Sequence, residues 1–245
     1  MGFNDFDWNN ARTENGAIRV EGTTEATMSI LRWVYMWMGL GMLTTAMMAY
    51  LTYSTPALLA VATSTVGVFG SIILSLGLVF ALSFAINRVS PMVAGFMFFG
   101  YALVLGFSLS TIFLVYTSGT ISTAFFTTSV MFGIMTVFGF TTKMDLTRFG
   151  AFFMMALIGL IVAMVINFFI GSSALDLIIS WVGVLIFVGL TAYDTQRIKY
   201  MAADPAMQAD SDMAMKMSII GALGLYLNFI NIFLFLLQIL GGGRD

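Results

Sequence analysis

Three polar side chains in otherwise apolar stretches are the first candidates for chemistry. Asp194 lies in FVGLTAYDTQRIKY, and Asn228 and Asn231 lie three residues apart in GLYLNFINIFLFLLQILGGG. That spacing puts both asparagines on one face of a helix. A carboxylate facing lipid costs several kcal/mol, so acids in spanning helices usually face the bundle interior or an aqueous cavity and mark ion or proton paths. Asp194 is therefore a candidate for an ion pathway.

The same residues also have a structural interpretation. Asp194 lies three residues before Arg197, near the expected end of its span, where an acid can reach water or pair locally. Asparagines between spans commonly form interhelical hydrogen bonds worth about 1 kcal/mol. Tyr226 and Asn167 are further candidate polar groups, accessory to the asparagines. The residue types alone leave both interpretations open.

Other charges lie at the ends of apolar stretches. Arg88, in FAINRVSPMV, either anchors a span end through its apolar stem or forms an ion pair with Asp194 that closes a pathway. Asp176 is expected to lie at a helix start, where a carboxylate favours the helix dipole. The segment TTKMDLTRFG is expected to form a tight, charged turn.

The composition determines the class of protein that must hold these residues. The chain has 245 residues, of which 60% are hydrophobic and 9% are charged. Soluble domains are about half apolar and a quarter charged, so this mixture indicates an all-α protein that crosses a membrane several times. The sequence contains no histidine or cysteine, no nucleophile elbow and no phosphate loop. We therefore expect no enzyme activity, no cofactor and no nucleic acid partner.

Seven apolar stretches are long enough to span a bilayer core of about 30 Å, which requires roughly 20 helical residues. A polar segment, 1–32, precedes them, and the short tail 242–245 follows. The start of the second stretch is ambiguous between Ala57 and Val66. The expected spans are Trp33–Tyr53, Val66–Ile86, Met92–Tyr116, Ile121–Thr142, Gly150–Ile170, Leu175–Gln196 and Met217–Leu240.

The distribution of lysine and arginine predicts the orientation, because basic loops stay on the cytoplasmic side. With the N-terminus inside, one basic residue, Arg244, lies outside. The loops 54–65, 117–120 and 171–174 contain none. The cytoplasmic set is then Arg12, Arg19, Arg32, Arg88, Lys143, Arg148, Arg197, Lys199 and Lys216.

Several motifs resemble the Bax inhibitor-one family, also called the transmembrane Bax inhibitor motif family. GLTAYDTQRIK followed by SIIGALGLYLNFINIFLFLLQILG is similar to the last two spans of that family. TTKMDLTRFGAFFMMALIGLIVAMVINFFI is similar to a loop and fifth span of its bacterial members. The resemblance covers roughly residues 31–241 and implies seven helices with the last one central in the bundle.

The resemblance also implies a function, a calcium leak that responds to pH. In this family two aspartates on the sixth and seventh spans share a proton, and an arginine of the second span can pair with the first of them. Asp194 matches the first aspartate through YDTQ and becomes a candidate calcium ligand, while Arg88 is the nearest candidate for the arginine. Asn228 replaces the second aspartate, because YLNFIN stands where the family has YLDFIN. An amide cannot titrate, so the shared-proton switch should be absent here and calcium coordination weaker.

Two functions from different classes follow. The first is a calcium leak or cation channel gated near Asp194 and Asn228. The second is a non-conducting regulator that binds a membrane protease or stress-response proteins through its N-terminal segment. Both predict a multi-pass protein surrounded by lipid, and the likeness to bacterial members favours the inner membrane.

Overall fold

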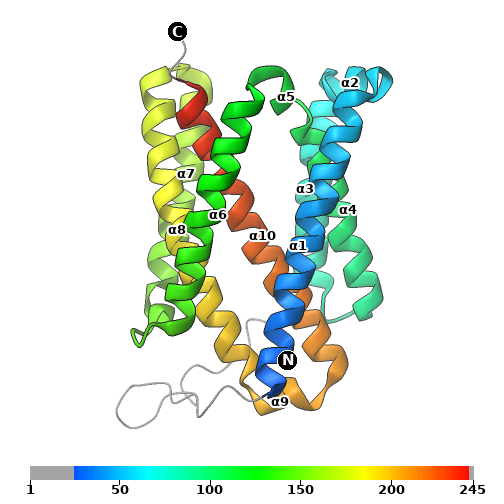
Figure 1. Cartoon of the computed structure of the whole chain (residues 1–245), viewed down its shortest axis with the longest axis vertical. Helices are drawn as coiled ribbons and strands as arrows, with labels where there is room; N and C mark the ends of the chain where they lie inside the picture. The colour runs from blue at the N-terminus through cyan, green and yellow to red at the C-terminus, as the bar shows by residue number, and fades with distance from the viewer. Residues whose placement is uncertain (1–24, 243–245) are drawn as a thin grey trace. The chain divides into compact units, whose positions relative to one another are not determined.

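In the computed structural model, residues 25–242 are described and consist of helices and the turns that join them, without any strand in that range (Figure 1). The all-α prediction is therefore confirmed. The elements are α1 (Glu25–Ser54), α2 (Pro56–Ala62), α3 (Thr65–Ala85), α4 (Pro91–Leu109), α5 (Ile112–Val115), α6 (Ser118–Thr141), the 3₁₀ helix η1 (Leu146–Phe149), α7 (Gly150–Ile170), α8 (Ser173–Ala202), α9 (Pro205–Ala209) and α10 (Ser211–Gly241).

Seven helical segments in the described range are long and apolar enough to cross a membrane, which confirms the expected number. Their ends differ from the sequence-based bounds because helices continue into more polar residues. α1 begins at Glu25 rather than Trp33, and α8 continues past Gln196 to Ala202. The ambiguous region before the second span forms a helix of its own, α2, and the span begins at Thr65.

Short polar side chains and prolines determine where several spans begin. The side chains of Ser64, Ser90 and Thr117 each accept a hydrogen bond from the backbone N–H three residues later. These bonds satisfy amide groups that a helix start leaves without partners. Pro56 and Pro91 occupy the first turns of α2 and α4, where a missing N–H costs nothing.

α7 ends at a glycine because the chain must reverse within two residues. Gly171 has φ = 67°, in the left-handed region that side chains with a Cβ rarely adopt. Its N–H donates to the carbonyl oxygen of Asn167 at 2.7 Å, which closes the last turn of α7. α8 can therefore start at Ser173.

The described chain forms two compact units. Unit 1 comprises residues 25–115 and 200–226, and unit 2 comprises residues 116–199 and 227–242. Both α8 and α10 supply residues to each unit. The predicted central position of the last helix and the cytoplasmic N-terminus stay predictions, and most of the polar segment 1–32 and of the tail 242–245 lies outside the described residues.

In unit 1, α4 packs against both α1 and α3, as Figure 1 shows. Gly106 allows α4 to approach α1 closely, because a Cβ there would lie 2.5 Å from the carbonyl oxygen of Thr45. The hydroxyl of Thr45 donates to the carbonyl oxygen of Ala102 at 2.9 Å and accepts from the buried Tyr226 hydroxyl at 2.6 Å. Tyr226 thus joins α10 to the α1–α4 pair.

In unit 2, α8 lies beside both α6 and α7 (Figure 1). A Cβ on Gly139 of α6 would collide with the backbone of Ala192, so the two helices are in backbone contact there. On the other side, the Phe153 ring of α7 lies over Gly189. Small residues therefore allow the close packing that spanning helices need in the absence of a hydrophobic driving force between them.

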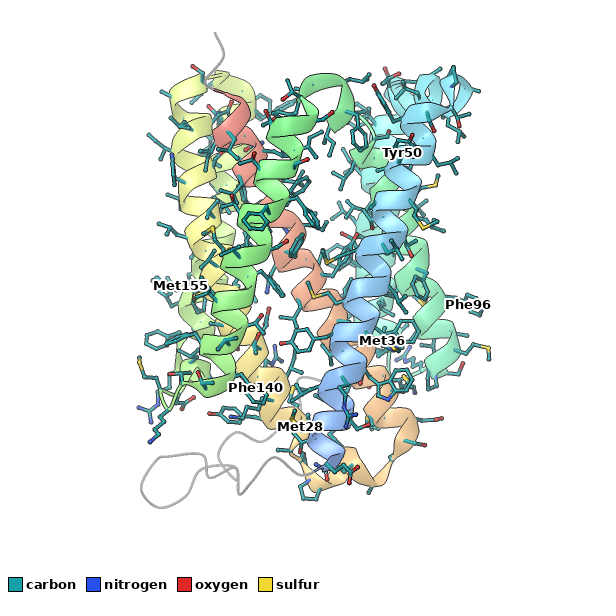
Figure 2. The ribbon with its side chains drawn as sticks, viewed as in Figure 1. Met28, Met36, Tyr50, Phe96, Phe140 and Met155 are labelled. Carbon is teal, nitrogen blue, oxygen red and sulfur yellow. The ribbon has the colours of Figure 1, made fainter. Side chains whose placement is uncertain are left out.

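Large apolar side chains cover the outward faces of both units. Phe96 and Met155 are 72% and 73% exposed, and Figure 2 shows both pointing away from the helices that carry them. In water such a surface would be unfavourable, whereas lipid chains solvate it. The exposed apolar side chains agree with a chain that lies in a bilayer.

Candidate functional site

Asp194 and Asn228 meet in unit 2, as the sequence predicted. The amide nitrogen of Asn228 donates a hydrogen bond to Oδ2 of Asp194 at 2.7 Å. Asn228 is 4% exposed and Asp194 is half-buried. An ionised carboxylate has about four positions that can accept a hydrogen bond. Within the described residues, the side-chain amide of Asn228 donates to the carboxylate of Asp194. The remaining positions on Asp194 can accept a proton or contact a cation.

Asp194 lies further from its helix end than the sequence indicated. Because α8 continues to Ala202, Asp194 is about 12 Å from that end at 1.5 Å per residue. Asn228 lies about 26 Å from Ser211, where α10 begins. The hydrogen bond therefore joins the interiors of two long helices, where an unpaired carboxylate would be costly.

Aromatic rings and backbone contacts hold these helices in place. Phe229, next to Asn228, lies 5.6 Å from the ring centres of both Phe125 and Phe132 of α6, in edge-to-face arrangements. Such pairs contribute about 0.5–1.5 kcal/mol beyond their buried area. α6 thus packs against both partners of the site, against α10 through Phe229 and against α8 through Gly139.

Gln196 connects α8 to the loop before α7, and Lys199 connects α8 to the last turn of α6. The sequence analysis did not identify either role. Oε1 of Gln196 accepts from the N–H of Leu146 at 2.7 Å, and Nε2 donates to the carbonyl oxygen of Met144 at 2.7 Å. Nζ of Lys199 donates to the carbonyl oxygen of Phe140 at 2.8 Å. A glutamine and a lysine three residues apart on one helix face were the available signal.

The loop at the start of α7 is the tight, charged turn that the sequence indicated. Asp145 accepts hydrogen bonds from the N–H and hydroxyl of Thr147 and forms an ion pair with Arg148 at 3.1 Å. Burial raises the pKa of Asp145, but these bonds and the charge of Arg148 outweigh it and hold the pKa below its usual value of 3.8. The carboxylate stays ionised and caps η1.

Two of the predicted accessory groups have structural roles instead. Nδ2 of Asn231 donates to the carbonyl oxygen of Leu227 in its own helix at 2.8 Å. Asn167 lies at the turn between α7 and α8, where its side chain bonds to Ser172 and to the Asp176 carboxylate. Asp176 is about 27 Å along α8 from Asp194, so the structure does not bring Asn167 together with the Asp194–Asn228 pair.

Asp176 itself does more than the helix-dipole interpretation allowed. It lies in the first turn of α8 as predicted. In addition, it accepts a hydrogen bond from Asn167 of α7. The carboxylate therefore joins two consecutive helices through one side-chain contact, because the α7–α8 turn is short enough to bring the two residues together.

The two remaining candidates belong to unit 1. The Tyr226 hydroxyl is engaged by Thr45, as described above. Arg88 is exposed in the turn after α3, with its N–H bonded to the carbonyl oxygen of Ala85 at 2.8 Å. Its predicted ion pair with Asp194 would join unit 1 to unit 2 and stays a prediction.

The arrangement allows one kind of chemistry: the hydrogen-bond partner of the Asp194 carboxylate can be exchanged for another. Within residues 25–242 no three acidic, cysteine or histidine side chains gather as a metal site. Oδ2 of Asp194 holds an amide N–H, which a cation or a proton can replace at the same oxygen. Replacing that N–H breaks a contact between α8 and α10.

Comparison with known proteins connects this arrangement to a family. The family model described as "Inhibitor of apoptosis-promoting Bax1" matches residues 27–245. The inner membrane protein YbhL of Escherichia coli (strain K12) is 44% identical over 212 residues, which cover 86% of this chain and 90% of YbhL. An uncharacterized protein of Deinococcus radiodurans is 43% identical over 230 residues, covering 94% and 96% of the two chains.

The family match covers the seven spans and both helices of the site. The comparisons confirm the resemblance that the motifs indicated, and the name of the E. coli relative agrees with the predicted inner-membrane location. The chain belongs to the Bax inhibitor-1 family and is a multi-pass integral membrane protein.

Proposed function

We propose that this protein is a cation leak of the bacterial inner membrane with Ca²⁺ as the permeant ion, controlled by the contact between Asp194 and Asn228. The observation that carries the proposal is the 2.7 Å hydrogen bond between the two side chains. This bond lies between two spanning helices, and in it the neutral amide of Asn228 occupies one carboxylate oxygen of Asp194, where another partner can replace it.

The energetic cost of this carboxylate supports a functional role. A charged residue costs about 2.5–3.5 kcal/mol at the centre of a spanning helix, and less at the position of Asp194, about 12 Å from the end of α8. An interhelical hydrogen bond returns about 0.6 kcal/mol on average and about 1.7 kcal/mol at most. The bond returns less than the full central cost of a charge, part of which the nearby charge of Arg197 offsets. A neutral pair would hold α8 to α10 without that cost.

The permeation step in this proposal is a competition for Oδ2 of Asp194. In the closed form the amide of Asn228 holds that oxygen. When the helices move apart, the carboxylate accepts a passing cation, which is a hard ion that prefers oxygen ligands. Because Asn228 is neutral and cannot titrate, we do not propose a switch based on two carboxylates sharing a proton.

The test is Ca²⁺ entry into liposomes that contain the purified full chain, compared with Asp194→Asn and Asp176→Asn. Asp194→Asn keeps the size of the side chain and its capacity for a hydrogen bond to Asn228 but removes the charge. We expect it to lower the flux at least about tenfold, a change of ~1.4 kcal/mol. Asp176→Asn is the matched control in the same helix and should conduct as the wild type does.

Flux that does not exceed that of empty liposomes at any pH between about 5 and 8 would refute conduction. The alternative function, a non-conducting regulator, would then be tested by crosslinking in native membranes with and without residues 1–30. Equal flux through both asparagine variants and the wild type would leave conduction intact but remove Asp194 from the pathway.

A further inference from the structure

A pocket in unit 1 is independent of the Asp194 site. It opens where the end of α3 meets α9 and the first turns of α10. All of its lining residues belong to one unit. They are Ile86, Asn87, Met207, Met213, Lys216, Met217 and Ile220.

The chemistry of the lining is apolar with one positive charge. Isoleucine and methionine side chains supply most of the wall, and Lys216 and Asn87 supply the polar groups. No acid lines the pocket. Lys216 is half-buried, and among the described residues its ammonium has no ion-pair partner. An ammonium group and an amide N–H₂ both donate hydrogen bonds, so together they suit an anion.

Nearby charges and dipoles modulate this preference without reversing it. Asp212 lies one turn before Lys216 on α10 and lowers the local positive potential. The start of α10 carries partial positive charge and the end of α3 partial negative charge, so the two helix ends roughly offset each other. Lys216 is therefore the charged side chain that lines the pocket itself.

The position of the pocket indicates where the anion comes from. Ile86 and Asn87 directly follow the last residue of α3, and Lys216 lies near the start of α10. Both helices are long and apolar enough to span a bilayer. The ends of such helices lie at the headgroup level, where lysine contributes about 1 kcal/mol of attraction to anionic lipid.

The enclosed part of the pocket is about the size of one water molecule, and Met207 and Met217 are 6% and 4% exposed, so a ligand must lie across its open mouth. We propose that this mouth binds one anionic phospholipid, with the phosphate on Lys216 and Asn87 and the first part of an acyl chain against the half-buried Met213 and Ile220. Methionine suits that contact because its unbranched, polarizable side chain adapts to an irregular apolar partner. The combination of one cation, one amide and an apolar wall is amphipathic, as is the lipid. A soluble phosphate would use the polar groups alone.

The test is native mass spectrometry of the purified full chain titrated with phosphatidylglycerol and, separately, with phosphatidylcholine. We expect the first phosphatidylglycerol to bind more tightly than phosphatidylcholine, and Lys216→Gln to weaken that first event about fivefold, as expected for the loss of one lysine at an anionic surface. Asp212→Asn should strengthen it, because it removes the nearby negative charge.

Lys143→Gln is the matched control, since Lys143 is an exposed lysine of the α6–α7 loop that does not line the pocket. It should leave phosphatidylglycerol binding unchanged. If both lysine variants weaken binding equally, the lipid responds to overall charge and the pocket is not its site. If excess inorganic phosphate displaces the lipid from the wild type, the site serves a soluble anion and the lipid assignment is wrong.

Lys216→Gln changes a half-buried side chain at a helix start, so its fold is checked by its thermal unfolding midpoint without lipid. A second measurement keeps the test valid if Lys216→Gln proves unstable. Phosphatidylglycerol should raise the midpoint of the wild type more than that of Asn87→Leu, which removes the amide and keeps the size of the side chain. Equal increases would overturn the proposed phosphate contact.

Discussion

Asn228→Asp should convert the site into a pair of carboxylates that share one proton. At the 2.7 Å that separates the amide nitrogen from Oδ2 of Asp194, two unit charges in an effective dielectric of about 20 repel by ~6 kcal/mol. Protonating an ordinary aspartate at pH 7 costs ~4 kcal/mol. Because the repulsion exceeds that cost, the variant should keep one proton in the pair at neutral pH.

The retained proton makes the stability of the variant depend on pH. The folded pair binds one more proton than the unfolded chain, in which both carboxylates are ionised at pH 7. Stability relative to the wild type should therefore fall by ~1.4 kcal/mol for each unit that the pH rises above about 5. Loss of the proton at higher pH would force α8 and α10 apart through the repulsion of two charges.

Two measurements check this prediction. The thermal unfolding midpoint of Asn228→Asp, relative to the wild type, should fall as the pH rises, and Ca²⁺ flux into liposomes should depend more steeply on pH. Asn231→Asp is the control, because Asn231 bonds to its own helix and not to a carboxylate. Stability and flux profiles of Asn228→Asp that are parallel to those of the wild type would show that the two positions do not share a proton.

Three further predictions concern the packing and the loop of unit 2. Gly139→Ala should destabilise the protein by about 1–3 kcal/mol because the new Cβ meets backbone of α8. Gly133→Ala is the control, because a Cβ there would lie in open space on the same helix, and it should be neutral or stabilising. Equal unfolding midpoints of the two alanine variants would contradict the close contact between α6 and α8. Asp145→Asn should lower the unfolding midpoint at neutral pH. The difference in midpoint from the wild type should shrink as the pH falls below about 3.8, because the lowered pKa of Asp145 stabilises the fold only while the carboxylate is ionised. A difference in midpoint that grows in acid would refute this. Gln196→Leu leaves an N–H and a carbonyl of the loop 142–149 without partners, at about 1–3 kcal/mol each, and should speed proteolysis of that loop. Unchanged cleavage would mean that the loop is held by other contacts.

Hydropathy predicted the number of spans and their approximate positions because each span must be apolar over its own length. It did not predict the ends. α1, α8 and α10 all extend beyond their apolar cores, since backbone hydrogen bonding continues wherever no cap or proline stops it. The start of α3 is an exception that could have been read from Ser64, whose hydroxyl caps the helix.

The sequence also predicted the pairing of Asp194 with Asn228, through the motif rather than through spacing. Residue type and burial in an apolar stretch could not by themselves separate Asn228 from Asn167, because both are asparagines in apolar helices. Only the fold shows that Asn167 bonds to the α7–α8 turn and to Asp176, whereas Asn228 faces Asp194. Residue type gives hydrogen-bonding capacity, and the position of the neighbouring helix decides which partner uses it.

The amino-acid sequence by itself determined the class of protein, the seven spans and the family, because apolar length and local motifs are properties of contiguous residues. The tertiary structure alone decided that Gln196 holds the loop before α7, that Lys199 bonds to the last turn of α6, that Tyr226 bonds to Thr45, and that Lys216 lines a pocket with Asn87. Each of these contacts joins residues far apart in the chain. Their geometry depends on helix packing, which no local stretch of sequence encodes.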